Sequence, residues 1–343
     1  MDNPAVIQTY GNTKLPESTP DRPLVTFALF AFNQEKYIRE AVEGALSQTY
    51  SPLEIILSDD CSTDRTFEIM QEMAAAYEGP HEVRLRRNPE NLNVAPHVLR
   101  VLREAKGEFF VLAAGDDVSD PLRTKKIIEC FQETGATGVH SGCRLIDDAG
   151  SIVAENYVAK GGVHVRSWFC ADQASFIHGA TSAYSRRVMK YLPEKQYNIH
   201  GEDGLLTTAI LANGLTIRFL EDKLVDYRTH AAALSNSTAA NRDFNSIIAH
   251  EKKLSRAVAS YLELCDFARG AVERSADQAI DKKEIISRID KAILRFSFRK
   301  MVYSPSPSVR MRALLKCRTF EDLKFALSRV FGLSFFARVK SIA

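Results

Sequence analysis

The stretch LVTFALFAFNQEKYIREAVEGALSQTYSPLEIILSDD, residues 24–60, decides the fold. It opens with a continuous apolar run, Leu24 to Phe32, of the kind that forms a strand buried on both faces. Residues 35–47 then carry apolar side chains at helical spacing, and residues 53–57 form a second apolar strand. A strand, a helix and another strand in such close succession predict a βαβ unit with parallel strands and a right-handed crossover.

The same alternation continues to about residue 120. Further helices and strands are predicted over residues 67–77, 83–87, 94–105, 108–113 and 121–134. Repeated units of this kind build an α/β fold around a largely parallel sheet. Beyond that stretch, strands and helices mix irregularly.

The chain is expected to have three parts. Residues 1–22 are rich in proline and show no periodicity, so they predict an irregular lead-in. Residues 23–238 form the mixed α/β body, and residues 239–343 form a helical, basic C-terminal extension.

Composition excludes several classes of protein. The 343 residues are 45% hydrophobic and 26% charged, which excludes a disordered or collagen-like chain. The longest apolar stretch is far shorter than a membrane-spanning helix and no signal segment opens the chain, so a cytoplasmic protein is expected. The six cysteines are scattered without a C-x-x-C pair, which favours buried thiols over a zinc site or a disulfide framework.

Charge is distributed unevenly along the chain. The net charge is +2, but residues 291–343 hold twelve Lys and Arg against two acidic residues. A basic end on an acidic body indicates a negatively charged partner, either a membrane or a nucleic acid.

Paired carboxylates follow two of the predicted strands. Asp59 and Asp60 come after one strand, Asp116 and Asp117 after another, and Phe32 ends the first strand. Ligands of open parallel sheets bind where the carboxyl ends of the strands meet, so these side chains are expected at one edge. Hard oxygen ligands suit Mg²⁺ or Mn²⁺ carrying a phosphate, although an aspartate there can also cap the next helix.

Absent motifs narrow the chemistry. The chain has no G-x-G-x-x-G after its first strand, no G-x-x-x-x-G-K-[ST] and no G-x-S-x-G. These absences argue against a dinucleotide fold, a P-loop and a serine hydrolase. A nucleotide-phosphate site assembled from carboxylates, a metal and an aromatic residue remains.

Several stretches resemble family 2 glycosyltransferases, in the order that this family has them. Residues 24–66 resemble the family's opening, with an aromatic-Asn step, SQTY and the pattern DD-x-S-T-D-x-T. The stretches NPENLNVAPHVLRVLREAKGEFFVLAAGDD (88–117), GEDGLLTTAILANG (201–214) and DYRTHAAALS (226–235) resemble later family motifs. The resemblance covers about residues 24–235.

This resemblance implies a GT-A fold, a nucleotide-diphospho-sugar donor, a divalent metal and inversion at the anomeric carbon. By the same resemblance, Phe32, Asp59 and Asp60 would hold the nucleotide base. Asp116 would belong to the metal-diphosphate motif, with Asp117 as the more direct metal ligand.

The catalytic base and a further metal residue also come from the resemblance. Asp203 would be the general base, because an acceptor hydroxyl with a very high pKa needs one within hydrogen-bond reach. An acidic pair at a helix start can instead complement the helix dipole. His230, in Y-R-x-H, would lie at the diphosphate or the metal, or serve a structural role.

The leading hypothesis is therefore a metal-dependent glycosyltransferase of bacterial surface polysaccharide or other glycan synthesis. Alternatives are a metal-dependent nucleotidyltransferase, in which Asp203 has no role, and a catalytically silent GT-A-like binding or scaffold protein. Acceptor contacts are expected within residues 151–200, including Trp168, His178 and Tyr184.

The basic end carries an apolar stripe. Within residues 319–343, aromatic and aliphatic side chains alternate with Arg and Lys, a composition that suits the face of an anionic bilayer. The enzyme would then lie on the inner face of the plasma membrane, beside a glycan or lipid-linked acceptor. A C-terminal helix packed on the body is the alternative, and no nucleic-acid-binding module is present.

Overall fold

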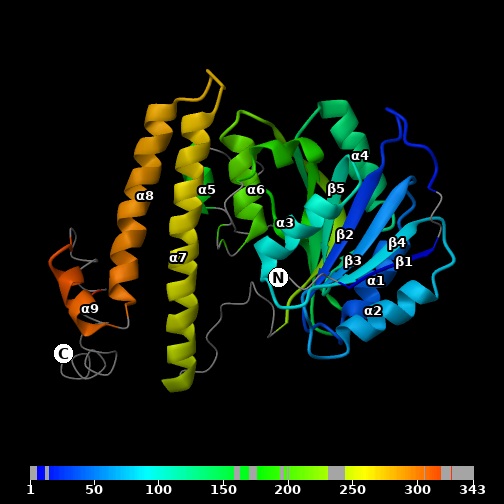
Figure 1. The fold of residues 1–343 in the computed structure, drawn as a ribbon, viewed down its shortest axis with the longest axis horizontal. Coiled ribbons are helices and arrows are strands. Elements are labelled where there is room, and N and C mark those ends of the chain that lie inside the picture. The colour runs from blue at the N-terminus through cyan, green and yellow to red at the C-terminus, as the bar shows by residue number, and fades with distance from the viewer. Residues whose placement is uncertain are drawn as a thin grey trace. The chain divides into compact units, whose positions relative to one another are not determined.

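The computed structural model describes most of the chain. The described residues are 6–11, 15–157, 163–169, 176–193, 197, 199, 201–230, 244–304, 306–317 and 326. The chain divides into two compact units (Figure 1). The sheet unit comprises residues 1–236 and 271–281, and the helical unit comprises residues 237–270 and 282–343.

A ten-stranded mixed sheet forms the centre of the sheet unit. Its strands are β1 (Val6–Gly11), β2 (Val25–Ala31), β3 (Leu53–Asp59), β4 (Glu82–Arg87), β5 (Phe109–Ala114), β6 (Val118–Ser119), β7 (Gly138–Ile146), β8 (Ile152–Tyr157), β9 (Ser182–Ser185) and β10 (Ile217–Arg228). Their order is β1-β4-β3-β2-β5-β9-β7-β10-β6, with β8 paired to β7. The strands β4, β3, β2 and β5 run parallel, as the alternating pattern predicts.

Helices of the sheet unit connect and cover these strands (Figure 1). They are α1 (Ile38–Leu46), α2 (Thr66–Ala75), α3 (Val94–Glu104), α4 (Arg123–Thr134), α5 (Val163–Phe169) and α6 (Glu202–Leu211), with short 3₁₀ helices η1 (Gly179–Thr181) and η2 (Arg186–Tyr191). Every residue of β3 is buried, and β2 is buried along nearly its whole length. The apolar run from Leu24 to Phe32 therefore forms the centre of the core.

The lead-in is more ordered than expected. The sequence predicts an irregular segment over residues 1–22, whereas Val6–Gly11 forms β1, which pairs antiparallel with β4. This strand lies at the edge of the sheet, and the side chains of residues 7–11 are half-buried or exposed. A strand with little burial carries little apolar periodicity, so its pairing partner, rather than its own pattern, makes it a strand.

The helical unit is built from long helices. They are α7 (Phe244–Arg274), whose C-terminal end belongs to the sheet unit, α8 (Lys282–Val302) and α9 (Pro307–Leu314). Within this unit the rings of Tyr261 and Phe296 stack at 5.0 Å, and Arg269 pairs with Asp290 at 3.0 Å. No helix of the described residues is long and apolar enough to cross a membrane.

Candidate active site

The carboxyl ends of five strands meet at one edge of the sheet. The strand β9 runs antiparallel to both β5 and β7, and β10 runs parallel to β7, so β7 and β10 end at the same edge as β2, β3 and β5. The segments that follow these strand ends carry Phe32, Asp60, Asp116, Asp147 and His230. The topology thus brings the predicted base-binding and metal-diphosphate residues to one edge.

The loops after β2 and β3 are held together by side-chain bonds to the backbone. The amide of Asn33, at a positive φ of 51°, donates to Ser62 Oγ at 2.9 Å, and Thr63 N donates to Asn33 Oδ1 at 2.8 Å. Asp60 N donates to Ala31 O at 2.9 Å. Phe32, next to these hydrogen bonds, is 44% exposed, and an exposed aromatic ring is a group on which a base can stack.

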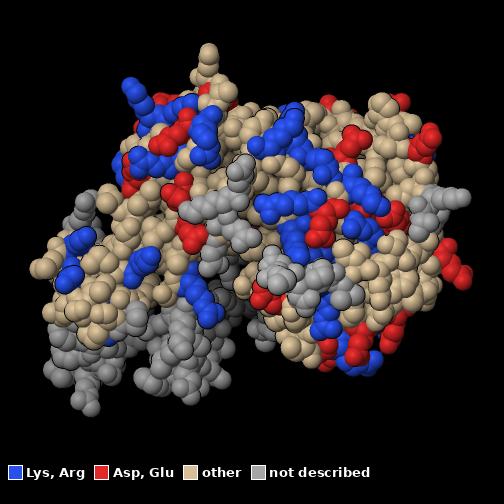
Figure 2. Space-filling view, in the orientation of Figure 1, with Lys and Arg blue, Asp and Glu red and all other residues tan. Residues whose placement is uncertain are grey.

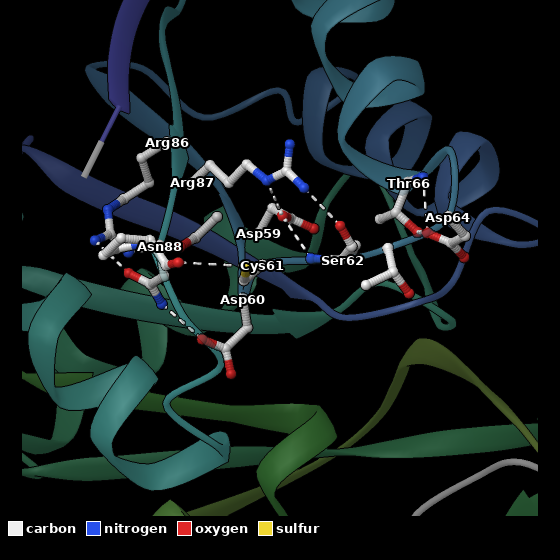
Figure 3. A network of polar contacts seen from close by, with 12 residues as sticks. Asp59, Asp60, Cys61, Ser62, Asp64, Thr66, Arg86, Arg87 and Asn88 are labelled. Carbon is white, nitrogen blue, oxygen red and sulfur yellow. Dashed lines mark hydrogen bonds and ion pairs between the residues drawn. The ribbon is translucent and has the colours of Figure 1, made fainter. Parts of the chain in front are cut away.

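The two carboxylates of the first acidic pair, Asp59 and Asp60, belong to different polar networks. Asp59 is wholly buried, and its Oδ2 accepts from Ser62 N at 3.0 Å and pairs with Arg87 Nε at 3.3 Å. Burial raises the pKa of Asp59, although these partners oppose the shift. Asp59 therefore anchors the loop. The next residue, Asp60, belongs to a second polar network with Asn88 and Arg86 (Figure 3).

The two carboxylates of the second acidic pair, Asp116 and Asp117, also have different surroundings. Asp116 Oδ2 lies 3.0 Å from His230 Nε2, and the His230 ring packs on Tyr37 with ring centroids 4.6 Å apart. Asp117 is 4% exposed, and its Oδ1 accepts from Arg228 N at 2.8 Å. The structure therefore brings Asp116 and His230 together and places Asp117 beneath them in the protein interior.

Asp117 carries an unsatisfied oxygen. Among the described residues no hydrogen-bond partner meets its buried Oδ2. Burial, with the neighbouring Asp116 charge, raises its pKa well above the usual range, despite the nearby guanidinium groups of Arg123 and Arg228. A buried carboxylate oxygen in this state is stabilised when it shares a proton or a cation.

The candidate metal ligands are the carboxylates of Asp116 and Asp117 and the imidazole of His230. No group of three or more His, Cys, Asp or Glu within the described ranges is arranged to hold a metal ion. Mg²⁺ and related ions, however, are commonly bound by one or two carboxylates together with phosphate oxygens of the substrate. Asp116 and Asp117 fit that manner of binding, with His230 beside Asp116.

Arg228 contacts several segments of the site, and the sequence motifs do not predict a role for it. Its side chain is 1% exposed and donates to Asp116 O at 2.9 Å, Asp147 O at 3.2 Å and Glu40 Oε2 at 2.7 Å. It ties the β5 end, the turn after β7 and helix α1 to the end of β10. Its place in Y-R-x-H is the sequence signal that marks it.

The acidic pair Glu202-Asp203 begins α6. The side chain of Asp203 accepts from Gly204 N at 2.6 Å and from the backbone of Gly179, while burial raises its pKa to about 6. Glu202 is buried, and burial together with the Asp203 charge raises its pKa to about 8. Burial thus raises the pKa of both carboxyl groups, and the Asp203 carboxylate, when ionised, can accept a proton.

Residues expected to contact an acceptor fall into two groups. Trp168 and Tyr184 are 1% and 0% exposed, so their side chains lie in the core and the prediction is wrong for both. His178 lies next to η1 and packs edge-on against Tyr227 at 5.0 Å, and burial lowers its pKa to about 4. Large aromatic side chains fill cores as readily as they bind ligands, which is why sequence could not separate the two roles.

Comparison with known proteins decides the family. The model of "Glycosyl transferase family 2" matches residues 26–192, the part of the chain that contains β2 to η2 and the acidic pairs Asp59-Asp60 and Asp116-Asp117. These residues form a family 2 glycosyltransferase domain. The resemblance drawn from the sequence motifs is thereby confirmed for residues 26–192, while the motifs at 201–214 and 226–235 lie outside the match.

Curated relatives of this family 2 domain match it in part. EpsE of Bacillus subtilis, which is named as a glycosyltransferase, is 36% identical over 111 residues, or 32% of this chain and 39% of EpsE. TuaG of the same organism, named as a teichuronic acid biosynthesis glycosyltransferase, is 29% identical over 130 residues, or 38% of this chain and 50% of TuaG. The chain spans about a third of the length of the first relatives it matches.

Among solved structures, TarS of S. aureus, residues 1–349 in complex with UDP-GlcNAc, is similar in fold to this chain. The two share 16% sequence identity with a TM-score of 0.51, over 89% of this chain and 88% of that one. The family 2 domain thus has the predicted GT-A fold, followed by helices, and the predicted fold class is confirmed.

Proposed function

We propose that this chain is an inverting glycosyltransferase that moves a sugar from a nucleotide-diphospho-sugar to an acceptor hydroxyl, with residues 23–238 as its catalytic domain. The proposal rests on the family 2 match and on the acidic groups that the fold gathers at the carboxyl edge of the sheet. The name of TuaG supports a role in the synthesis of a surface polysaccharide.

Donor binding is assigned to the edge formed by β2, β3 and β5. Phe32 offers an exposed ring for base stacking, and Asp60 offers a hydrogen-bond acceptor beside it, with Asp59 holding their loop in place. Asp116 and Asp117 lie at the end of β5, where the diphosphate is expected. This division places base and diphosphate at neighbouring strand ends, as open α/β sheets commonly do.

A divalent metal, Mn²⁺ or Mg²⁺, fits the second acidic pair. The unpartnered Asp117 Oδ2 and the outward-lying Asp116 carboxylate would hold it, with His230 positioned against Asp116. When bound, such an ion stabilises the negative charge that develops on a leaving diphosphate. Arg228 and Arg123 lie close enough to Asp117 to lower its pKa and so favour the ionised form.

Asp203 is the proposed general base. It takes the proton of the acceptor hydroxyl while the acceptor oxygen bonds to the anomeric carbon. The bond from that carbon to the diphosphate breaks, and its electron pair leaves with the nucleoside diphosphate. Because the nucleophile attacks opposite the leaving group, the anomeric configuration inverts. The hydrogen bonds from Gly179 and Gly204 orient the carboxylate and favour its ionised form.

One observation carries the assignment of the base: the Asp203 carboxylate lies at the start of α6, accepts hydrogen bonds from the backbone of Gly179 and Gly204, and has its pKa raised by burial. A structural carboxylate at a helix start needs no raised pKa, whereas a base working near neutral pH benefits from one.

The test is the substitution Asp203→Asn. Release of nucleoside diphosphate is measured over a panel of UDP-, GDP- and dTDP-sugars, together with the thermal shift that each nucleotide produces. We expect release to fall at least about a hundredfold while the nucleotide-induced shift survives. The exposed Asp21→Asn is the matched control and is expected to behave as wild type. Equal loss of binding and release in Asp203→Asn contradicts a role as base.

Membrane association through residues 319–343 is proposed as a separate property. It would hold the enzyme on the inner face of the plasma membrane, beside a lipid-linked or growing glycan acceptor. The support is the sequence, in which basic and aromatic side chains alternate; apart from residue 326 the segment lies outside the described residues. Basic residues near an anionic bilayer each add about 1 kcal/mol of attraction.

A further inference from the structure

A buried polar network of Asn88 and Arg86 holds Asp60 in place (Figure 3). Asn88 follows β4 directly, and its backbone N–H donates to Asp59 O at 2.9 Å, which extends the β3–β4 ladder by one residue. Its side chain, 1% exposed, donates from Nδ2 to Asp60 Oδ1 at 2.7 Å. Its Oδ1 accepts from Arg86 Nη2 at 2.9 Å. Asn88 therefore connects a buried guanidinium to the carboxylate of Asp60.

Only one orientation of the Asn88 amide satisfies both neighbours. A guanidinium can only donate hydrogen bonds and an ionised carboxylate can only accept them. The amide oxygen must therefore face Arg86 and the amide nitrogen must face Asp60. Arg86 is itself fixed, because its Nη1 donates to Ser58 Oγ at 2.8 Å and its Nε lies 3.2 Å from Glu104 Oε2. The direction of the whole chain of bonds is thus determined by Arg86.

The consequence falls on the two oxygens of Asp60. Oδ1 accepts from Asn88 Nδ2 and also from Leu92 N at 3.0 Å, and His97 Nδ1 lies 3.9 Å away. Burial lowers the pKa of His97 to about 3, so this imidazole is neutral and supplies no competing charge. Oδ1 thus has two donors, the backbone of Asn93 also hydrogen-bonds to this carboxylate, and Oδ2 is the oxygen that points away from Asn88 in Figure 3.

We propose that Asn88, oriented by Arg86, is a positioning residue that fixes Asp60 as a hydrogen-bond acceptor and thereby sets which nucleotide bases the donor site takes. This inference rests on the proposed function, in which Asp60 meets the base. An acceptor oxygen pairs with bases that carry an imino N–H on the Watson–Crick edge, namely uracil, thymine and guanine. Cytosine and adenine present an acceptor nitrogen at that place, so their pairing with Asp60 leaves two acceptors opposed.

A base-selectivity panel tests the proposal. Binding of UDP, dTDP, GDP, CDP and ADP to the full chain is measured calorimetrically, with Mn²⁺ present. Wild type is expected to prefer one or more of the three imino nucleotides. In Asn88→Ala, affinity for these is expected to fall about tenfold, the effect of one hydrogen bond to a charged group, while CDP and ADP change little. The discrimination between the two classes shrinks by the same factor.

The substitution Asp60→Asn tests the same network, because asparagine has nearly the same shape as aspartate. Its amide oxygen takes the place of Oδ1, because Asn88 Nδ2 and Leu92 N are both donors, and its amide nitrogen then replaces Oδ2. A donor in that place pairs with the acceptor nitrogen of cytosine. We expect Asp60→Asn to bind CDP more tightly than wild type and UDP less tightly, and we expect the added Asn88→Ala to weaken this exchange.

The matched control is Asn213→Ala, which removes an asparagine that lies in the turn after α6 and donates to Ala209 O at 2.9 Å. It is expected to leave the selectivity unchanged. Equal weakening of all five nucleotides in Asn88→Ala, or a wild-type preference for CDP or ADP, overturns the positioning role. Where Asn88→Ala does not fold, the exchange in Asp60→Asn decides. Absence of binding of every nucleotide to wild type instead overturns the proposed function itself, so the two failures are distinguishable.

Discussion

Replacing Arg228 with methionine removes the guanidinium that ties four segments of the active site together and keeps the length of the side chain. The lost bonds are those to Asp116 O, Asp147 O, Asp148 O and the carboxylate of Glu40. The backbone bond from Arg228 N to Asp117 remains, because it does not depend on the side chain. The perturbation is therefore confined to the guanidinium.

The magnitude follows from the partners. The Glu40 side chain is 54% exposed, so water replaces much of that ion pair and its loss costs at most about 1 kcal/mol. The carbonyls of Asp116 and Asp147 lose a charged donor in the protein interior, at about 1–3 kcal/mol each, offset by the relief from burying a guanidinium. We expect a net loss of about 2–4 kcal/mol. In a unit of this size, that lowers the melting temperature by about 5–15 °C.

Trp168 makes the measurement specific. It is the only tryptophan in the chain, lies in the sheet unit and is 1% exposed, so its fluorescence reports the unfolding of that unit. Arg65→Met is the control, because its side chain is 65% exposed and its ion pairs with Glu68 and Glu72 lie on the surface. A change below about 2 °C in Arg228→Met, equal to that of the control, refutes the reasoning.

Four further predictions concern the same chain. Nucleoside diphosphate release should fall about tenfold for each pH unit below about 6, because protonated Asp203 cannot act as base; a flat rate–pH profile there contradicts the assignment. The folded pKa of Glu202, about 8, exceeds its unfolded value, so the unfolded chain binds fewer protons and stability falls as pH rises from about 4.5 to 8. Glu202→Gln should flatten this fall in urea titrations followed by Trp168 fluorescence, and an unchanged slope contradicts it. A nucleotide-induced thermal shift that depends on Mn²⁺ should disappear in Asp117→Ala; its persistence excludes Asp117 as a metal ligand. Deleting residues 319–343 should release the protein from anionic liposomes in a sedimentation assay while nucleotide binding persists, and unchanged sedimentation contradicts the membrane proposal.

The parts of the fold that sequence predicts well are those whose pattern is set by burial. The run from Leu24 to Phe32 has no polar side chain apart from Thr26, and it becomes β2 at the centre of the sheet. Strands buried on both faces must be apolar throughout, so their pattern is strong. The edge strand β1 has no such requirement, which is why residues 1–22 do not predict it.

The start of the first helix shows a second limit. Apolar spacing predicts a helix over residues 35–47, whereas α1 begins at Ile38. The backbone N–H groups of Gln34 and Glu35 donate instead to Thr66 Oγ1 and Asp64 Oδ2, which lie beyond β3. These bonds satisfy N–H groups ahead of α1 that have no partner within the helix, and a periodicity window does not contain acceptors so far along the chain.

The candidate site also has features that the sequence predicts and features that depend on contacts with distant segments. Carboxylates that follow strands can be placed at one edge from the sequence, because parallel strands end together, and Asp60, Asp116 and Asp117 lie there. What each carboxylate does at that edge depends on partners from other segments. Arg87 pairs with Asp59 and anchors it, whereas Asn88 Nδ2 and Leu92 N both donate to one oxygen of Asp60. Adjacent residues of identical type therefore acquire different roles, and only the contacts made after folding separate them.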